Sequence, residues 1–375
     1  MIADHLKDLK ASPIREILKY APKNAINLAL GEIRFNTPEP ICDKAVSFIK
    51  KAQVYYTENA GLKELRDAIA IKYNTNSDSI CVTNGAQEAL FVSLFSLLNP
   101  NDKIMIGDPT FLAYQSIACV LQAEVIKFKF DKANNFSLDK QDFEDKIKLK
   151  PKILLITHPS NPTGISFTLD EMNFICQKCK EYNVLLIVDE VYLDLSFRQE
   201  IISFKSVMKD SIIISGLSKS ACMTGWRLGW IVCDNKDLIL RLILSHQFIT
   251  TCASTISQQA AIEALSVTSQ SKILAIKEKL KDNYQLCVKK LSPYFKELNT
   301  IYKPDSAPYL FLKTSEVNDI EFVKKLCNNG VIVVPGSAFG DNGRGYFRMS
   351  YAIEQDILNR ALDILIDFCK INLTK

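Results

Sequence analysis

This chain of 375 residues has few histidines, little excess of charge of one sign and no long apolar run. Only three histidines are present, so no histidine-rich metal site is expected. The 46 basic and 42 acidic residues give a formal charge of +4, too even a balance to predict a nucleic-acid or membrane partner. No run approaches the roughly 18 apolar residues of a membrane helix, and residues 1–10 lack the apolar stretch of a signal peptide.

Eleven cysteines are present, but their spacing matches neither a disulfide-rich domain nor paired zinc ligands. Cys176 and Cys179 form the one C-x-x-C pair, within a helical pattern over residues 172–182. We interpret them as structural thiols of a reducing cytoplasm rather than as a redox motif. His158 and His246 are expected to pack, or to support neighbouring groups, rather than to catalyse.

Short apolar runs rich in β-branched residues alternate with amphipathic helical patterns through the first part of the chain. The predicted strands cover residues 103–107, 124–130, 152–157, 184–188 and 211–215. The predicted helices between them cover residues 61–73, 87–98 and 169–181. This alternation is typical of an α/β fold with a mostly parallel sheet.

Beyond about residue 260 the pattern changes, which predicts a second, smaller α+β unit. One long helix is expected over residues 257–291, strands over residues 309–312 and 331–334, and a C-terminal helix from residue 354. We therefore predict a large domain over residues 36–259 and a small domain formed by residues 1–35 and 260–375. No linker or internal repeat separates them, so an extensive interface between the domains is expected.

Polar residues directly follow several of the apolar runs. In an open α/β sheet, ligands collect at the carboxyl ends of strands, so these segments are candidate sites. They are residues 158–164, 189–192 and 215–219, together with residues 83–88 ahead of a helix. In the last segment the amides of Ala86 and Gln87 could hold an anion after the turn at Gly85, although short glycine turns into helices are common.

Lys219 and Asp189 each follow or end an apolar strand. A lysine partly withdrawn from water has a lowered pKa and can act as a nucleophilic amine; the alternative is a solvated charge at a strand end. A buried Asp189 needs a partner for its charge. The protonated pyridine ring of pyridoxal 5'-phosphate (PLP) would be such a partner, and the alternative is that the side chain caps a following turn or helix.

Five motifs together resemble the class I aminotransferases of the aspartate/aromatic type. The most specific is Ser218-Lys219 followed by MTGWRLGW at residues 223–230. The others are SNPTG at residues 160–164, DEVY at 189–192, FRMS at 347–350, and Tyr56 followed by GLKELR at 61–66. The resemblance covers nearly the whole chain and implies the fold type I architecture, which binds PLP.

By this resemblance, Lys219 carries PLP as a Schiff base and then moves the proton between the substrate Cα and the cofactor. Asp189 would pair with the pyridine nitrogen, and Asn161 and Tyr192 with the phenolic oxygen. Phe111 would stack on the cofactor ring. The implied catalytic residues are Lys219, Asp189 and Tyr192.

The resemblance also implies how the phosphate and the substrate are held. The residues implied to bind the phosphate are Ser218, Arg227 and the amides of Ala86 and Gln87. Tyr56 would reach it from a neighbouring subunit, which implies a homodimer with shared active sites; the alternative is an ordinary buried tyrosine. The residues implied to bind the substrate are Arg348, which grips the α-carboxylate, Gly31 and Asn161.

The implied activity is transfer of the amino group of an L-amino acid to a 2-oxo acid with ping-pong kinetics. Aspartate, glutamate or a broad set of donors is expected, with 2-oxoglutarate as acceptor. After Gly31 the family often has Pro-Asp-Phe, whereas residues 32–35 read EIRF; Arg34 either is exposed or contacts a second substrate carboxylate. The alternative activity on the same fold is that of a carbon–sulfur β-lyase.

Overall fold

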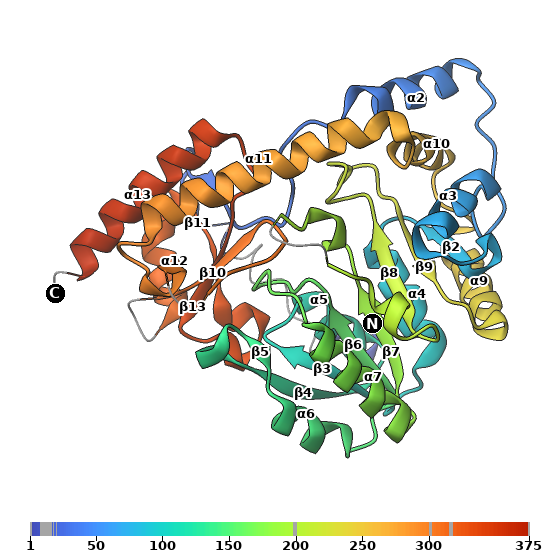
Figure 1. The fold of residues 1–375 in the computed structure, drawn as a ribbon, viewed down its shortest axis with the longest axis horizontal. Coiled ribbons are helices and arrows are strands. Elements are labelled where there is room, and N and C mark those ends of the chain that lie inside the picture. The colour runs from blue at the N-terminus through green and yellow to red at the C-terminus, as the bar shows by residue number, and fades with distance from the viewer. Residues whose placement is uncertain are drawn as a thin grey trace.

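A mostly parallel sheet of eight strands forms the centre of the molecule (Figure 1). The computed structural model describes residues 2–7, 17, 19, 21–197, 201–299, 302–314 and 318–373. In the order of the sheet, the strands are β2 (Ile80–Thr83), β9 (Gly229–Val232), β8 (Ile212–Gly216), β7 (Leu185–Asp189), β6 (Ile153–Thr157), β3 (Lys103–Asp108), β4 (Glu124–Asp131) and β5 (Ser137–Leu138). Strands β8 to β4 are parallel, while β9 and β5 pair antiparallel with their neighbours. The predicted α/β class is confirmed.

The interior strands are apolar along their whole length because helices cover both faces of the sheet. All five residues of β6 are buried, and successive residues face opposite sides, as Leu154 and Leu155 do. The helices between strands are α3 (Lys63–Tyr73), α4 (Ala86–Leu97), α5 (Leu112–Val120), α6 (Lys140–Ile147), α7 (Leu169–Tyr182), α8 (Phe204–Val207) and α9 (Lys236–Thr250). Helices α4, α5 and α9 pack on one face of the sheet, and α3, α6 and α7 on the other.

The register of the parallel strands brings their carboxyl ends together at one edge. Thr157 at the end of β6 pairs with Asp189 at the end of β7, and Asp189 pairs with Ile214 of β8. The segments that follow these strands therefore start side by side, as expected for a ligand site of an open α/β sheet.

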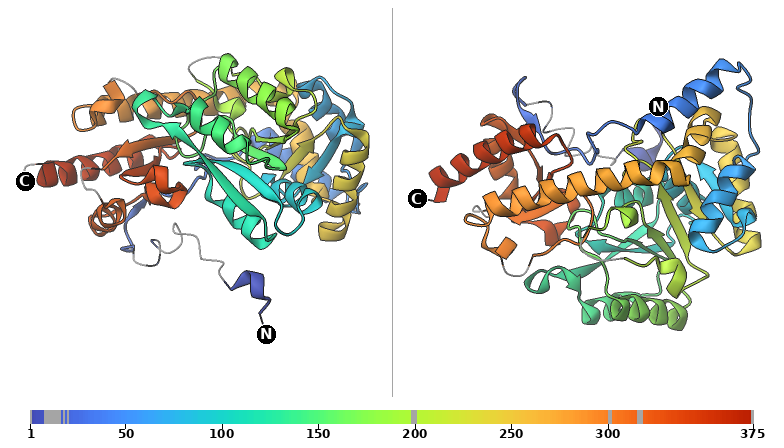
Figure 2. Two further views of the ribbon diagram at one scale, coloured as in Figure 1. Left: turned by 90° about the horizontal axis from the view of Figure 1, so that it is seen from below. Right: turned by 45° about the horizontal axis from the view of Figure 1, so that its top comes forward.

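The C-terminal part builds a smaller unit beside the large sheet (Figure 2). Its three-stranded antiparallel sheet has the order β10 (Tyr309–Lys313), β13 (Tyr346–Ser350) and β12 (Val334–Pro335). Helices α12 (Asp319–Asn328) and α13 (Gln355–Leu373) pack with it, and β1 (Ile26–Asn27) pairs with β11 (Val331–Ile332). Residues 26–34 are thus joined to the C-terminal part, whereas the turn at Asp4–Leu6 contacts α5 of the large unit. The domain boundaries stay a prediction, with residues 1, 8–16, 18 and 20 outside the described residues.

The prediction of one helix over residues 257–291 is wrong. Helix α10 (Thr255–Ala264) ends before Ser266, whose side chain accepts a hydrogen bond from the Ser269 amide and caps α11 (Val267–Leu291). Helix α11 then runs from the region of α10 and α2 (Glu39–Lys50) to α13 (Figure 1). No helix in the described part of the chain is both long and apolar enough to cross a membrane.

Candidate active site

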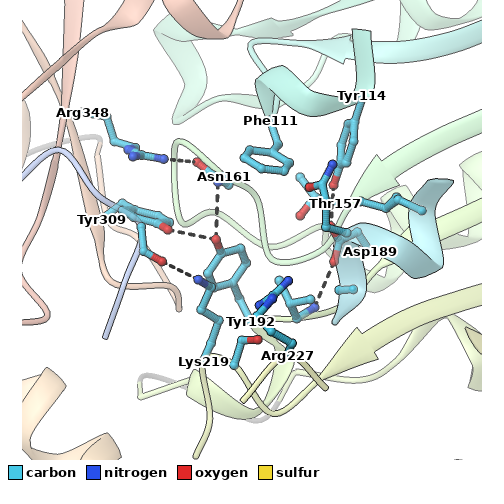
Figure 3. A pocket seen from close by; sticks show the side chains of 16 residues that line it. Phe111, Tyr114, Thr157, Asn161, Asp189, Tyr192, Lys219, Arg227, Tyr309 and Arg348 are labelled. Atoms are coloured by element: carbon cyan, nitrogen blue, oxygen red, sulfur yellow. Dashed lines mark hydrogen bonds between the residues drawn. The ribbon is translucent and has the colours of Figure 1, made fainter. Parts of the chain in front are cut away.

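Lys219 lies just past the carboxyl end of β8, after a turn through Leu217 and Ser218. Its Nζ donates a hydrogen bond to the Gly31 carbonyl, and the side chain lines a cavity of about 260 Å³ (Figure 3). Desolvation lowers the pKa of Lys219 to about 8, aided by the positive charge of Arg348. The amine therefore loses its proton more readily than an exposed lysine, which suits a nucleophile or a base.

Asp189 is the last residue of β7 and is buried beside the same cavity. The Tyr114 hydroxyl donates to its Oδ2 at 2.9 Å, and the Val191 amide donates to its Oδ1 at 3.3 Å. Desolvation raises the pKa of Asp189 to about 6, because it outweighs these bonds and the charge of Lys219. A buried carboxylate in this state is suited to a ligand that brings a positively charged N–H group.

An anion cradle forms where β2 turns into α4. Gly85 has a φ of +86°, a conformation that favours glycine, and precedes the first turn of the helix. A Cβ on Gly85 would lie 2.5 Å from Nη2 of Arg227, and a Cβ on Gly229 would collide with the Ala86 amide nitrogen. The two glycines thus allow a guanidinium and the free amides of a helix start to approach each other, an arrangement that binds phosphate or carboxylate.

Arg348 is a buried cation in β13, with an exposed fraction of 1%. Its Nη1 donates to Asn161 Oδ1 at 2.8 Å, and its Nη2 donates to the Ala29 carbonyl at 2.6 Å. The guanidinium lies 4.3 Å from the ring centre of Tyr309 and 4.8 Å from that of Phe339. Its Nε is buried and has no hydrogen-bond partner among the described residues. A buried guanidinium with a spare donor is suited to a carboxylate ligand.

A chain of hydrogen bonds extends from Arg348 into the cavity. Asn161 Nδ2 donates to the Tyr192 hydroxyl at 3.4 Å, and the hydroxyls of Tyr192 and Tyr309 are 2.9 Å apart. Figure 3 shows Asn161 and Tyr192 between Arg348 and Lys219, with Asp189 and Tyr114 on the other side of the cavity. Donors and acceptors for an oxygen-bearing ligand therefore lie next to the reactive amine.

Residues 23–365 match the family model described as aminotransferase class I and II. The chain belongs to this family. The protein is therefore an enzyme that transfers amino groups, and its solved relatives share its fold type I architecture. The resemblance expected from the five sequence motifs is confirmed.

The similarity of this aminotransferase to known proteins extends over nearly the whole chain. The chain is 34% identical to a probable aspartate aminotransferase from Methanocaldococcus jannaschii, over 97% of this chain and 99% of the relative. It is also 34% identical to an aspartate aminotransferase from Thermotoga maritima, over 92% of each chain. Among solved structures, an aspartate aminotransferase from Thermus thermophilus with maleate superposes with a TM-score of 0.92 at 25% identity, covering 98% of this chain and 99% of that one.

The predicted site residues of the aminotransferase lie together, with one exception. Those that line the cavity are Gly31, Ala86, Gln87, Phe111, Asn161, Asp189, Tyr192, Ser218, Lys219, Arg227 and Arg348. Tyr56 does not line it and is 85% exposed, so the alternative of an ordinary buried tyrosine is wrong.

Five residues that were not predicted complete the lining of the cavity: Leu90, Tyr114, Thr157, Val191 and Tyr309. Thr157 ends β6 and pairs with Asp189, so the rule that ligands collect at the carboxyl ends of parallel strands was enough to find it. Tyr114 lies in the first turn of α5, and its ring packs edge-on against that of Phe111, the N-cap of this helix. Tyr309 comes from β10 of the smaller sheet, and no local pattern in the sequence marks it.

The remaining candidates lie away from the chemistry. Cys176 and Cys179 are buried free thiols, and desolvation raises the pKa of Cys176 to about 11 and that of Cys179 further, so both are unreactive. Desolvation lowers the pKa of buried His158 to about 4, which keeps it neutral. Arg34 does not line the cavity, and its Nε lies 3.8 Å from the Glu32 carboxylate. The described residues contain no cluster of three or more potential metal ligands.

Proposed function

We propose that the cavity holds PLP, with Lys219 as its covalent attachment point. The observation that carries this is that a lysine of lowered pKa, a buried carboxylate and an anion cradle line one cavity. Each of the three suits one part of the cofactor: the amine its aldehyde, the carboxylate its protonated ring nitrogen, and the cationic and amide donors its phosphate. The residues present therefore fit the group.

When bound, PLP supplies an aldehyde that condenses with amines and a ring that withdraws electrons from the substrate Cα. We assign to Lys219 Nζ the transfer of the proton from and to Cα, as base and then as acid. The Asp189 carboxylate holds the proton of the ring nitrogen, while Asn161 and Tyr192 bond the phenolic oxygen and Phe111 stacks on the ring. The phosphate is assigned to Ser218, Arg227 and the amides of Ala86 and Gln87.

The substrate α-carboxylate is assigned to Arg348, together with Gly31 and Asn161. The buried Nε of Arg348 without a partner among the described residues supports this, because an incoming carboxylate would satisfy it. Gly31 supports it by its size: a Cβ there would collide with the Tyr309 hydroxyl, so only glycine leaves room for the backbone at this place.

Replacing Arg348 with alanine is expected to raise the KM of every α-amino acid by roughly 100-fold, since a charge-assisted two-point contact is lost. The measurement is initial rates over a concentration series of aspartate, glutamate and alanine. Arg348→Lys keeps the charge but not the planar fork, and should give intermediate values. An unchanged KM in Arg348→Ala would mean that another group binds the carboxylate.

We propose aspartate or glutamate as donor, or a broad set that includes them, and 2-oxoglutarate as acceptor. Three curated relatives named as aspartate aminotransferases or probable aspartate aminotransferases, at 30–34% identity, support this. The Thermus structure supports it as well, since it is of an aspartate aminotransferase with maleate, which is a dicarboxylate. Arg34 is not proposed as the partner of the second carboxylate, because it lies beside Glu32 and outside the cavity.

We propose a homodimer in which Tyr56 of each subunit reaches the phosphate of the other. Tyr55 and Tyr56 are 74% and 85% exposed on one loop, and Phe248 of α9 is 81% exposed. Large aromatic side chains in water are typical of a surface that another protein chain covers. We also propose a reducing compartment, the cytoplasm, because all eleven cysteines are free thiols.

The absorbance spectrum of the PLP-loaded protein, recorded with single amino acids and without any 2-oxo acid, tests the proposed function. Aspartate or glutamate is expected to convert the bound cofactor stoichiometrically from its aldehyde to its amine form, and 2-oxoglutarate to reverse this. If the spectrum persists while pyruvate accumulates from a cysteine conjugate, the enzyme is instead a carbon–sulfur β-lyase. If no PLP binds, the assignment of the cavity is wrong.

A further inference from the structure

His246 is a fully buried histidine of α9 that none of the steps above uses. Its Nδ1 lies 3.1 Å from the backbone carbonyl oxygen of Asn59, and its Nε2 lies 3.3 Å from Oε2 of Glu88, within ion-pair distance. A carbonyl and a carboxylate only accept hydrogen bonds, so both neighbours face the ring as acceptors. The ring is therefore hydrogen-bonded to Asn59 and in close contact with Glu88, on two separate segments, while Nε2 itself makes no hydrogen bond of regular geometry among the described residues.

Glu88, on one side of His246, holds the turn that forms the anion cradle. Its carboxylate accepts hydrogen bonds from the backbone amide of Asn84 and, at 3.2 Å, from Asn84 Nδ2. Desolvation raises the pKa of Glu88, but the contact with His246 and the bonds from Asn84 outweigh it, so its pKa lies below the ordinary value. Glu88 is thus an ionised acceptor that fixes the residue just before Gly85.

Asn84 is held at both ends of its side chain. Its Nδ2 also donates to Thr250 Oγ1 at 3.1 Å, and its Oδ1 accepts from the Ser254 amide at 3.2 Å. The next residue is Gly85, the N-cap of α4, which has a positive φ and lies directly beside the Arg227 guanidinium. Glycine has many accessible conformations, so the contacts of Thr83, Asn84 and Glu88 with this turn help to select the one that it adopts.

On its other side, His246 contacts the loop of the two exposed tyrosines. Asn59, whose carbonyl faces Nδ1, also donates from Nδ2 to the Thr251 carbonyl at 2.8 Å. Tyr55 and Tyr56 precede Asn59 by only a few residues. One imidazole therefore joins the cradle turn of its own subunit to the loop proposed to serve the neighbouring one.

We propose that His246 is a positioning residue for the cofactor phosphate, which acts through Glu88 and Asn84 on the amides after Gly85 and through Asn59 on the loop of Tyr56. This rests on the proposed function, since it assigns the cradle to the phosphate of PLP. Donors that are fixed before the ligand arrives bind it more tightly than donors that must be ordered on binding. The expected effect is therefore on the phosphate and not on the rest of the cofactor.

The test compares the binding of PLP with that of pyridoxal, which lacks the phosphate, to the cofactor-free full chain. His246→Ala is expected to weaken PLP about tenfold and to change pyridoxal by less than about twofold, since one supporting contact of a charged group is lost. Both dissociation constants are measured by absorbance titration. The ratio of the two isolates the phosphate from any general loosening of the protein.

Two conservative variants separate the two sides of the ring. His246→Gln keeps a donor near the position of Nε2, toward Glu88, and is expected to restore most of the PLP to pyridoxal ratio. His246→Asn keeps a donor near Nδ1, toward Asn59, and is expected to restore less. Asn283→Ala is the matched control, because Asn283 is also buried and bridges two carbonyls, those of Tyr351 and Ile353, but lies in the C-terminal part. It should leave the ratio unchanged.

The outcomes distinguish this inference from the proposed function. The positioning role is overturned if the ratio of the PLP and pyridoxal dissociation constants in His246→Ala equals that of the wild type, whether both constants are unchanged or both rise by the same factor. If His246→Ala does not fold, the comparison of the glutamine and asparagine variants decides, and equal ratios in these two overturn the route through Glu88. If the wild type itself binds PLP no more tightly than pyridoxal, the assignment of the cradle to the phosphate fails.

Discussion

Replacing Lys219 with alanine is expected to lower amino transfer by at least about 10⁴-fold, because the amine that would bond the cofactor and carry the Cα proton is lost. Asp189 and the anion cradle are not altered by this change, so PLP should still bind without a covalent bond. Two measurements check this: turnover with aspartate and 2-oxoglutarate, and equilibrium dialysis of PLP against the variant.

Lys219→Arg is the matched control for charge. It keeps a cation in the cavity, but a guanidinium does not release its proton at neutral pH and cannot serve as a base. Equal losses in the two variants would assign the role of Lys219 to bond formation and proton transfer rather than to charge. Turnover within about tenfold of the wild type in either variant would remove Lys219 from the mechanism.

The interior strands of the large sheet agree most closely with the expectations from sequence. The runs predicted at residues 152–157 and 184–188 correspond to β6 and β7 with shifts of one residue at their ends. A parallel strand that is covered on both faces is apolar throughout, so its burial leaves a continuous signal. The rule that ligands collect after such strands then selected the segments that contain Asn161, Asp189 and Lys219.

Features that depend on distant partners were not predictable in the same way. Residues 331–334 read as one strand, but Val331 and Ile332 pair with β1 while Val334 pairs with Arg348 of β13, so the run divides between two sheets. Tyr309 lies beside Arg348 because it pairs with Ser350, two residues further along the same face of β13. Strand pairing of this kind is set by the fold as a whole, and no local spacing encodes it.

The break between α10 and α11 has a different cause. Ser266 is the N-cap of α11, but a serine within an otherwise helical pattern is also tolerated inside a helix. Which of the two applies depends on whether the Ser269 amide is left free to bond the serine side chain, and the sequence pattern does not specify this. The same argument explains why the predicted helix over residues 257–291 was too long.

Replacing Asp189 with asparagine is expected to lower kcat by roughly 100-fold to 1000-fold, because a charge placed to stabilise the electron-withdrawing ring is removed. The amide preserves the size of the side chain and can still accept the hydrogen bond from Tyr114. The effect should therefore appear in kcat at saturating PLP rather than in the fold. Unaltered kcat would undo the pairing of Asp189 with the ring nitrogen.

The same substitution is expected to stabilise the cofactor-free protein at high pH. The pKa of Asp189 is raised from 3.8 to about 6 in the folded chain, mainly by desolvation, so the folded state binds more protons than the unfolded state between these values. Stability from this group is therefore lost as the pH rises through that window, by up to roughly 3 kcal/mol above it. Asp189→Asn removes this loss, so its free energy of unfolding should exceed that of the wild type at pH 8.

Denaturant unfolding of the two cofactor-free proteins at pH 4 and pH 8 checks the sign, since titrations of groups that do not interact with Asp189 cancel in the difference. The advantage of the asparagine variant should be small at pH 4 and largest at pH 8. A stability difference that does not change with pH would mean that desolvation does not raise the pKa of Asp189 in the folded chain. A lower kcat together with a higher stability would instead show that the chain keeps an unfavourable buried carboxylate because its reaction requires one.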